Sequence, residues 1–335
     1  DLIMIKNLIG KTFFVTGADG FIGSHLVELL VGLGANVKAL VYYNSWNEIG
    51  WLKDIPKSTL SHINIVRGDV RDSDHIRDLV AGCEYVIHLS SLIAIPYSYN
   101  APRSYLDTNV VGALNILQAC KESNSLTRLV HVSTSETYGS AQYVPINEIH
   151  PLVGQSPYSA SKIAADKIAE SFYLSFDLPV VTARPFNTFG PRQTARAVIP
   201  TIASQLVAGK KQLTLGALTP TRDFNYVTDT ALGIIKLALC SNAEGQVVNI
   251  GTGKEWSIKE TAEMLCTISG QHVEILSAED RIRPKKSEVN RLLADNTKLQ
   301  ELTGWKAEIK FEEGLKRTYS WIKKNIQYFD VDNYA

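Results

Sequence analysis

The stretch TGADGFIGSH, Thr16–His25, decides the fold. It places Gly17, Gly20 and Gly23 at intervals of three, directly after the apolar run TFFV and within the helical pattern that follows. Glycine permits a tight turn and lets the backbone come close to a phosphate group. The free N–H groups at the start of the next helix add a partial positive charge. A strand, a glycine turn and a helix in this order predict a dinucleotide-binding loop.

Strand and helix patterns go on alternating through the first half of the chain. Apolar runs such as NVKALVY, YVIHLS, RLVHVS and PVVTARP are separated by longer amphipathic stretches, among them 104–122 and 157–176. Continuously apolar strands joined by helices are typical of a parallel sheet covered on both faces. We therefore predict an α/β fold, a Rossmann doubly wound parallel sheet over 8–186. The shorter strands that follow predict a smaller α/β substrate-binding lobe over 187–328, with part of 223–255 returning to the first domain.

Composition excludes several classes of partner. Lysine plus arginine and aspartate plus glutamate both number 34 among 335 residues, so no excess of positive charge indicates nucleic acid or an anionic membrane. No apolar run reaches the ~18 residues of a membrane-spanning helix. The N-terminus lacks the basic and small-residue pattern of a signal peptide. Four scattered cysteines, without a CxxC pair or a metal-spaced cluster, predict buried free thiols, a cytoplasmic location and no metal.

The end of the second strand is where a dinucleotide-binding domain selects its cofactor. A carboxylate there favours NAD and a nearby arginine favours NADP, yet this chain has Val41 in that place and no arginine after it. Asn44 and Ser45 can bond either a ribose or a phosphate, so the sequence leaves NAD and NADP open. Further on, Asp69 and Val70 are candidates for the adenine site, although Asp69 also fits a simple turn.

Two further stretches carry the candidate chemistry. In YSASK, Tyr158 and Lys162 stand four residues apart and so share one face of a helix. An ammonium group near a phenol favours the phenolate and lowers the phenol pKa, which lets the tyrosine act as a base. In STSETYG, Thr134, Ser135 and Glu136 follow an apolar strand, and strand ends are where a parallel sheet meets its ligand. The simpler interpretation is that Glu136 caps the following turn.

The combination of motifs resembles the extended short-chain dehydrogenase/reductase family, and within it the nucleotide-sugar 4,6-dehydratases. The resemblance runs from Gly17 to Arg283. Epimerases of this family usually have a small or neutral residue where this chain has Glu136, whereas the 4,6-dehydratases have a carboxylate. The motifs are TGADGFIGSH, HLSS, DTNVVGALNIL, STSETYG, YSASK, RPFNTFGPR, RDFNYV and the Arg283–Pro284 pair.

The resemblance implies a role for each catalytic candidate. Tyr158, supported by Lys162, takes the proton of the sugar C4 hydroxyl while the cofactor takes the hydride, and Thr134 binds the C4 oxygen. The resulting ketone acidifies C5–H, Glu136 removes that proton, and the C6 hydroxyl leaves as water near Ser135. The dTDP-glucose enzymes have Asp-Glu where this chain has Ser135–Glu136, so Glu136 itself or a water molecule must protonate the departing hydroxyl.

The resemblance also implies two sets of binding residues. A tightly bound, recycled NAD or NADP would contact Tyr158, Lys162 and these further residues: Gly17, Gly20, Phe21, Ile22, Gly23, Asn44, Ser45, Asp69, Val70, Leu89, Ser90, Ser91 and Asn109. The nucleotide sugar would contact Asn187, Arg192, Val198, Pro200, Arg222 and Arg283. Arginine suits the diphosphate because its planar donors pair with two phosphate oxygens at once.

The substrate and assembly follow from the same resemblance. The segment VYYNSWNEIGWL is similar to dehydratases that act on N-acetylglucosamine nucleotides in nonulosonic acid biosynthesis. UDP and GDP are not distinguished. UDP-glucuronate decarboxylase and nucleotide-sugar 4-epimerase stay as alternatives, and a non-catalytic NAD(P)-binding sensor is the alternative of a different class. Helices over 104–122 and 157–176 would pair with their copies in a four-helix homodimer interface.

Overall fold

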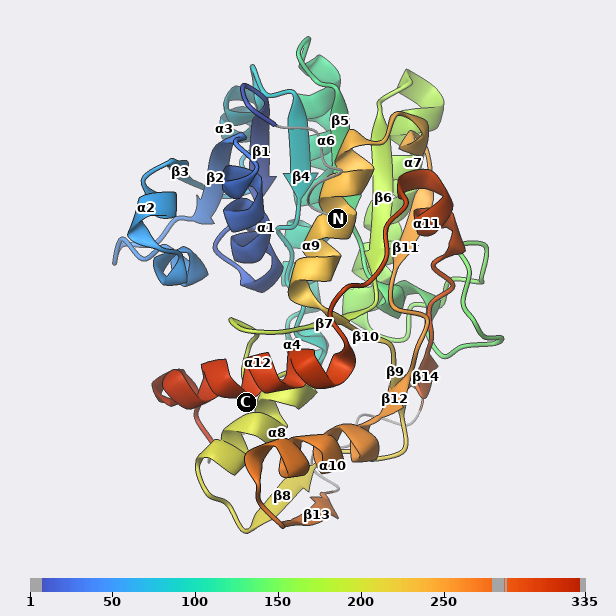
Figure 1. Ribbon diagram of the computed structural model, residues 1–335. Coiled ribbons are helices and arrows are strands. Elements are labelled where there is room, and N and C mark those ends of the chain that lie inside the picture. The colour runs from blue at the N-terminus through green and yellow to red at the C-terminus, as the bar shows by residue number, and fades with distance from the viewer. Residues whose placement is uncertain (1–7, 279–285, 287, 332–335) are drawn as a thin grey trace.

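A parallel sheet of seven strands forms the larger part of the molecule (Figure 1). The computed structural model describes residues 8–278, 286 and 288–331. The strand order is β11-β6-β5-β4-β1-β2-β3, and each neighbouring pair is parallel. The strands are β1 (Thr12–Thr16), β2 (Asn36–Tyr42), β3 (Ile63–Gly68), β4 (Tyr85–His88), β5 (Arg128–Val132), β6 (Val180–Pro185) and β11 (Val247–Ile250). This confirms the predicted Rossmann-type α/β fold.

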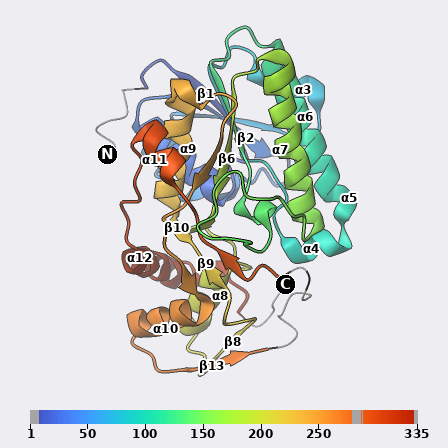
Figure 2. The same ribbon diagram turned by 90° about the vertical axis from the view of Figure 1, so that its right-hand side faces the viewer.

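Helices cover both faces of this sheet, and each face has its own apolar core (Figure 2). On one face lie α3 (Ser73–Val80), α6 (Gly112–Glu122) and α7 (Pro157–Phe176). On the other lie α1 (Phe21–Gly32), α9 (Val227–Leu239) and α11 (Thr297–Thr303). Both strand faces are therefore buried, as the continuously apolar strands predicted.

The region predicted as one long helix over 104–122 is divided into three pieces. It contains α5 (Pro102–Tyr105), the π-helical turn η3 (Leu106–Val111) and α6, and it is preceded by the short α4 (Ile95–Asn100). The amide of Asn109 lies inside the π-turn and bonds Leu92 and Ser161. Single π-turns inside helices commonly occur at functional sites. The helix predicted over 157–176 is present at those bounds as α7.

The second lobe lies below the sheet in Figure 1 and has its own apolar core. Its helices are α8 (Val198–Val207), α10 (Ile258–Ser269) and α12 (Phe311–Lys324). Its strands are β7 (Asn187–Phe189), β8 (Gln212–Leu215), β9 (Thr221–Arg222), β10 (Phe224–Tyr226), β12 (Trp256–Ser257), β13 (Glu274–Ser277) and β14 (Arg291–Leu292). The chain crosses back between β10 and β12, because α9 packs beside α1 and β11 pairs with β6. The domain limits 8–186 and 187–328 stay a prediction.

The cysteines and the helices also bear on the predictions made from composition. All four cysteines are free, but only Cys83 and Cys120 are buried, whereas Cys240 and Cys266 are partly exposed. The prediction of four buried thiols was therefore half wrong, since Cys240 follows the last residue of α9 and Cys266 of α10 lines an open pocket. Across the described part of the chain, no helix combines the length and apolar character that crossing a membrane requires.

Candidate active site

The glycine loop has the geometry of a phosphate cradle. It joins β1 to α1. Strands β2 and β4 lie on opposite sides of β1, so the strand order reverses here, and such a switch point is where parallel sheets bind ligands. Gly17 has φ +65°, and a Cβ there would lie 2.9 Å from the backbone nitrogen of Ser90. A Cβ on Gly23 would lie 2.0 Å from the oxygen of Gly17. Only glycine leaves this approach open, so the loop fits a dinucleotide pyrophosphate at the start of α1.

The end of β4 is fastened beside this loop. Thr16 Oγ1 accepts hydrogen bonds from the backbone nitrogens of Leu89 and Ser90, both at 3.1 Å. Asn109 uses its side chain to hold the next residues, since it accepts from the nitrogen of Leu92 at 2.8 Å and donates to its oxygen at 3.0 Å. Leu89, Ser90 and the partly exposed Ser91 therefore border the cradle, and Asn109 positions the loop that contains them.

The residues predicted for the adenosine end have partners within the protein. Asn44 bonds its own loop, donating to the oxygens of Tyr42 and Glu48 and accepting from the nitrogen of Glu48. Ser45 is exposed. The Asp69 carboxylate accepts a hydrogen bond from the Arg71 guanidinium at 2.5 Å, and this bond lowers the pKa of Asp69.

Val70 and Asp19 also lie near the glycine loop and the end of β2. Val70 is buried, and a Cβ on Gly112 would lie 2.8 Å from its Cγ2, so α6 presses closely on it. The sequence interpretation missed Asp19 of the glycine loop, whose carboxylate accepts from the nitrogen of Tyr42 at 3.3 Å. Its position between two loop glycines was the only available signal.

The catalytic candidates from β5 and α7 come together at the end of the sheet. The side chain of Thr134 lies beside Tyr158, where it lowers the pKa of the phenol against the larger, opposing effect of burial. Lys162, one turn further along α7, donates from Nζ to the backbone oxygen of Val132 at 2.8 Å. A capping box at Ser156 starts α7 immediately before Tyr158, with Ser156 Oγ accepting from the nitrogen of Ser159 at 3.1 Å. The helix start thus fixes the tyrosine against the strand end.

Burial controls the ionisation of this pair. It raises the pKa of Tyr158, and the nearby negative charge of Glu136 raises it further, while the side chain of Thr134 lowers it. Burial also lowers the pKa of Lys162 to about 8, against the opposing effect of the Asp166 carboxylate. The sequence predicted a lowered tyrosine pKa from the nearby ammonium. That prediction included the positive charge of a bound nicotinamide; in the protein alone the pKa of Tyr158 is raised, because removing the phenolate from water outweighs its neighbours.

Ser135 and Glu136 lie beside Thr134 and Tyr158, and these four residues together with Lys162 form the catalytic corner. They begin the 3₁₀ turn η4 (Ser135–Tyr138), which Thr134 caps by accepting from the nitrogen of Glu136 at 3.2 Å. The cap is therefore the threonine, and the Glu136 carboxylate forms no hydrogen bond with the described residues. Glu136 is partly exposed and its charge acts on Tyr158. Such a carboxylate is free to accept a proton from a ligand beside Tyr158.

The residues predicted for the nucleotide sugar lie on β7, α8 and β9 of the second lobe, apart from Arg192 and Arg283. Asn187 begins β7, and its buried Oδ1 finds no donor in the described part of the chain. Val198 begins α8 and is partly exposed, whereas Pro200 is buried. Arg222 on β9 forms an ion pair with Glu288 at 3.5 Å. Arg283 and the adjoining Pro284 lie outside the described residues.

Arg192 lies in the second lobe and forms ion pairs with the first. Its guanidinium forms ion pairs with Glu28 of α1 at 2.9 Å and with Asp54 of η2 (Gly50–Asp54) at 3.2 Å. Trp321 of α12 donates to the same Asp54 carboxylate at 3.1 Å. These contacts use the guanidinium to join the two lobes, while its buried Nη1 finds no partner in the described part of the chain, so the assignment of Arg192 to the substrate stays a prediction.

One aromatic neighbour was not anticipated. The ring of Tyr105 lies 6.2 Å from that of Tyr158, edge to face, and its hydroxyl donates to the oxygen of Ala94. Nothing in the local sequence distinguishes Tyr105 from the other tyrosines of that region. It closes the side of the catalytic corner formed by α4 and α5.

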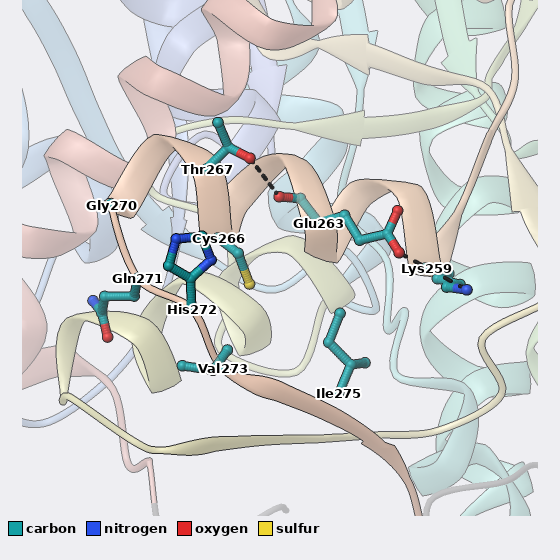
Figure 3. A pocket seen from close by; sticks show the side chains of 9 residues that line it. All are labelled: Lys259, Glu263, Cys266, Thr267, Gly270, Gln271, His272, Val273 and Ile275. Atoms are coloured by element: carbon teal, nitrogen blue, oxygen red, sulfur yellow. Dashed lines mark hydrogen bonds and ion pairs between the residues drawn. The ribbon is translucent and has the colours of Figure 1, made fainter.

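A separate pocket lies in the second lobe, away from the predicted site residues. It measures about 780 Å³ and lies between α10 and β13, where Cys266, His272 and Ile275 are among its lining side chains (Figure 3). None of the predicted site residues lines it. Among residues 8–278, 286 and 288–331, no cluster of three or more histidine, cysteine or acidic side chains is arranged to hold a metal ion.

The cradle at the switch point and the Tyr158–Lys162 pair define an NAD(P)-dependent enzyme of the short-chain dehydrogenase/reductase class. Comparison with known families gives the finer assignment. The sequence model described as GDP-mannose 4,6 dehydratase matches residues 14–318. The chain belongs to this family of nucleotide-sugar 4,6-dehydratases, as the motifs predicted.

Individual relatives agree with this assignment. The low-salt glycan biosynthesis protein Agl12 of Haloferax volcanii is 32% identical over 307 residues, which is 90% of this chain and 95% of the relative. The structure of dTDP-glucose 4,6-dehydratase from Bacillus anthracis in complex with NAD has a TM-score of 0.82 and 26% identity, covering 96% of this chain and 99% of that one.

Two further comparisons show the breadth of the family. A UDP-N-acetylglucosamine 4-epimerase from Methanobrevibacter ruminantium, in complex with UDP-N-acetylmuramic acid, has a TM-score of 0.85 and 29% identity, covering 95% of this chain and 99% of that one. A trifunctional UDP-glucose 4,6-dehydratase of Arabidopsis thaliana is 29% identical over 325 residues, or 95% of this chain. The chain spans about half the length, 48%, of that relative.

Proposed function

We propose that the chain binds NAD(P) and removes water from a nucleotide-activated hexose or hexosamine, producing a 4-keto-6-deoxy sugar nucleotide. The observation that carries the proposal is Glu136, a carboxylate without a hydrogen bond to the described residues, in the same corner as Thr134 and Tyr158. A site that oxidises C4 and holds a second base beside it can take one proton from the C4 hydroxyl and another from the neighbouring C5. The NAD in the Bacillus anthracis relative supports the choice of cofactor.

Tyr158 and Thr134 carry out the first proton transfer. With the sugar C4 hydroxyl at the Tyr158 oxygen, the phenolate takes the hydroxyl proton and Thr134 hydrogen-bonds the oxygen that becomes the ketone. The bound cofactor supplies the hydride acceptor for C4 and the hydride donor for C6. The buried Lys162 ammonium favours the phenolate electrostatically, and the glycine cradle holds the pyrophosphate.

Glu136 carries out the elimination. The C4 ketone makes the hydrogen on C5 acidic. The carboxylate takes this hydrogen as a proton, and the electrons of the C5–H bond form the C5=C6 double bond. The C6–O bond breaks, and the oxygen leaves as water with the proton that Glu136 returns. A hydride then reaches C6 and a proton from solvent reaches C5, so the balance is the loss of one water. Ser135 is buried beside Glu136 and lacks the acidity to protonate the leaving group itself.

The substrate of the proposal is an N-acetylglucosamine carried by UDP or GDP, in a route to nonulosonic acids. Asn187, Val198, Pro200 and Arg222 are proposed to contact it, and the buried, unpaired Oδ1 of Asn187 supports a ligand donor at that position. The UDP-sugar ligand in the Methanobrevibacter ruminantium relative supports a UDP-hexosamine derivative.

One experiment separates this function from its alternatives. The purified protein is incubated with a panel of UDP- and GDP-linked glucose, mannose, glucuronate and N-acetylglucosamine, and the products are weighed by mass spectrometry. Dehydration removes one water, decarboxylation removes carbon dioxide, and epimerisation leaves the mass unchanged but alters the sugar on chromatography. Absence of turnover with bound NAD(P) would favour the sensor.

We also propose a homodimer through α6 and α7 in the cytoplasm. Figure 2 shows these helices side by side on the outside of the molecule, and Leu106 and Val111 just before α6 are 50% and 42% exposed. The four free thiols support a reducing compartment. Light scattering is expected to give the mass of a dimer at micromolar concentration, and Leu106→Glu to give a monomer; a monomeric parent would contradict the interface.

A further inference from the structure

A buried polar network lies under the catalytic corner, with Asp166 of α7 at its centre. Asp166 is 3% exposed, and its carboxylate accepts hydrogen bonds from three directions. Ser133 Oγ of β5 donates to Oδ2 at 2.8 Å, and the Arg184 guanidinium of β6 donates to the same oxygen at 2.9 and 3.1 Å. His131 Nε2 of β5 lies 3.1 Å from Oδ1. Each of these partners is itself buried.

This network is costly if its only purpose is stability. Replacing a buried ion pair by apolar residues of similar size is often neutral or stabilising, so the Arg184–Asp166 pair needs another explanation. Its place in the fold provides one. Asp166 is four residues after Lys162 and eight after Tyr158, so the three share one face of α7.

Two hydrogen bonds fasten this helix face to the end of β5. Lys162 Nζ donates to the oxygen of Val132, and Ser133 Oγ donates to Asp166. The next residue along the chain is Thr134, which lies beside Tyr158 and caps the turn that carries Glu136. A shift of the strand end relative to α7 would therefore move Thr134 and Glu136 away from Tyr158 together.

We propose that Asp166 is a positioning residue, which latches the strand end bearing Thr134 and Glu136 to the helix bearing Tyr158 and Lys162. It touches neither substrate nor cofactor in this role. Its negative charge has a second effect, because it favours the ammonium form of Lys162 and disfavours the phenolate of Tyr158. The inference rests on the proposed function for its kinetic consequences only.

Other titratable groups around the network must be included in any pH test. His88 of β4 stacks on His131 at 5.9 Å, and its pKa is lowered first by burial and then by the nearby His131 and Lys162. Burial lowers the pKa of both histidines, so they are neutral near pH 7. Tyr138 of η4 lies under the Arg184 guanidinium at 4.9 Å, and burial raises its pKa to about 12. None of these neighbours changes charge around pH 8, where Lys162 titrates.

Two variants separate the latch from the charge. Asp166→Asn keeps the shape but removes the charge, so the limbs of the pH–rate profile set by Tyr158 and Lys162 should both move to lower pH, by about one unit. Ser133→Ala removes one latch bond and keeps the charge. It should lower kcat about tenfold with KM and the pH profile unchanged. A residue that acts only on folding would lower the melting temperature without moving the pH profile.

A substrate-free measurement makes the result independent of the proposed function. The ultraviolet absorbance of tyrosinate is followed against pH in the NAD(P)-loaded protein, and the Tyr158→Phe signal is subtracted to isolate Tyr158. Asp166→Asn should ionise Tyr158 at lower pH than the parent. If no sugar in the panel is turned over, the dehydratase proposal fails while this titration still tests Asp166.

The outcomes that overturn the inference are specific. If Tyr158 titrates at the same pH in Asp166→Asn as in the parent, the proposed charge effect is contradicted. If kcat is unchanged in Ser133→Ala, the proposed positioning role is contradicted. Should Asp166→Asn fail to fold, Asp166→Glu replaces it. That variant keeps the charge but displaces the carboxylate, so a reduced kcat with the parent pH profile is expected, and full activity would contradict positioning.

Discussion

The ammonium of Lys162 donates a hydrogen bond to the backbone oxygen of Val132 at 2.8 Å, which joins helix α7 to the last residue of strand β5. The bond fixes where the two catalytic segments meet, since Tyr158 lies one turn before Lys162 and Thr134 lies two residues after Val132. It also keeps a charged group where little water reaches it. The geometry of the catalytic corner therefore depends on the helix and the strand end together.

Replacement of Glu136 by glutamine tests the proposed base. The Glu136→Gln side chain would keep the shape of the turn but could not accept the C5 proton, so dehydration should fall by ~10²- to 10⁴-fold. Cofactor affinity should stay at the parent value, because the cradle lies on β1 and α1. The measurement is product mass together with uptake of deuterium from solvent at C5. Parent-level dehydration in this variant would exclude Glu136 as the base.

The pH dependence of the parent tests the Lys162 environment. Burial lowers its pKa to about 8, so the ammonium that favours the Tyr158 phenolate is present below that pH and is lost above it. We expect kcat at saturating substrate to decline as the pH rises through about 8. Lys162→Arg is the control, because a guanidinium does not lose its proton in this range and the decline should disappear. A parent rate that stays level through the same range would contradict this assignment.

The glycine cradle predicts a contrast between two alanine substitutions in α1. A Cβ at Gly23 would lie 2.0 Å from the Gly17 oxygen, whereas one at Gly32 meets nothing within 4 Å. Gly23→Ala should destabilise the fold by about 1–3 kcal/mol and weaken NAD(P) binding. Gly32→Ala should leave both unchanged or slightly improve stability. Thermal unfolding and cofactor fluorescence measure the two effects, and equal behaviour of the variants would argue against a close-packed cradle.

Substitution of Arg192 tests whether this arginine joins the two lobes or binds the substrate. Arg192→Met breaks ion pairs with Glu28 and Asp54, so the free energy of unfolding should fall by about 1–3 kcal/mol. KM for the nucleotide sugar should change by less than about twofold, since the energy lost is not binding energy. Arg103→Met is the matched control, because Arg103 is 85% exposed at its side chain and pairs only with its helical neighbour Asp107 among the described contacts. A large rise in KM for Arg192→Met would return it to the substrate site.

The sequence predicted the parts of this protein that local patterns determine. The glycine spacing, the continuously apolar strands and the YxxxK pair each depend on neighbours along the chain, and the fold and family they predicted are confirmed. Arg192 could not be placed this way, because its partners Glu28 and Asp54 are more than a hundred residues away in sequence. The π-turn at Asn109 likewise depends on Leu92 and Ser161, which come from other segments.

Ionisation was the other property that the sequence did not determine. The pairing of Tyr158 with Lys162 was visible as a spacing, yet the burial that raises the tyrosine pKa depends on how α4, α5 and η4 close around the corner. Asp166 could have been found by extending the same spacing one step further along the helix. Its partners on β5 and β6 appear only when the sheet is assembled.

The pairing of β11 with β6 constrains the order in which the chain can acquire its structure during synthesis. When residue 186 has been made, β6 has one free edge, and the sheet face that α9 later covers is open to water. The free edge of β6 is paired and this sheet face is covered only after some sixty more residues have been made, most of which form part of the other lobe. Until then the nascent chain presents an unpaired apolar strand, a surface that holding chaperones recognise, and the two lobes must mature together.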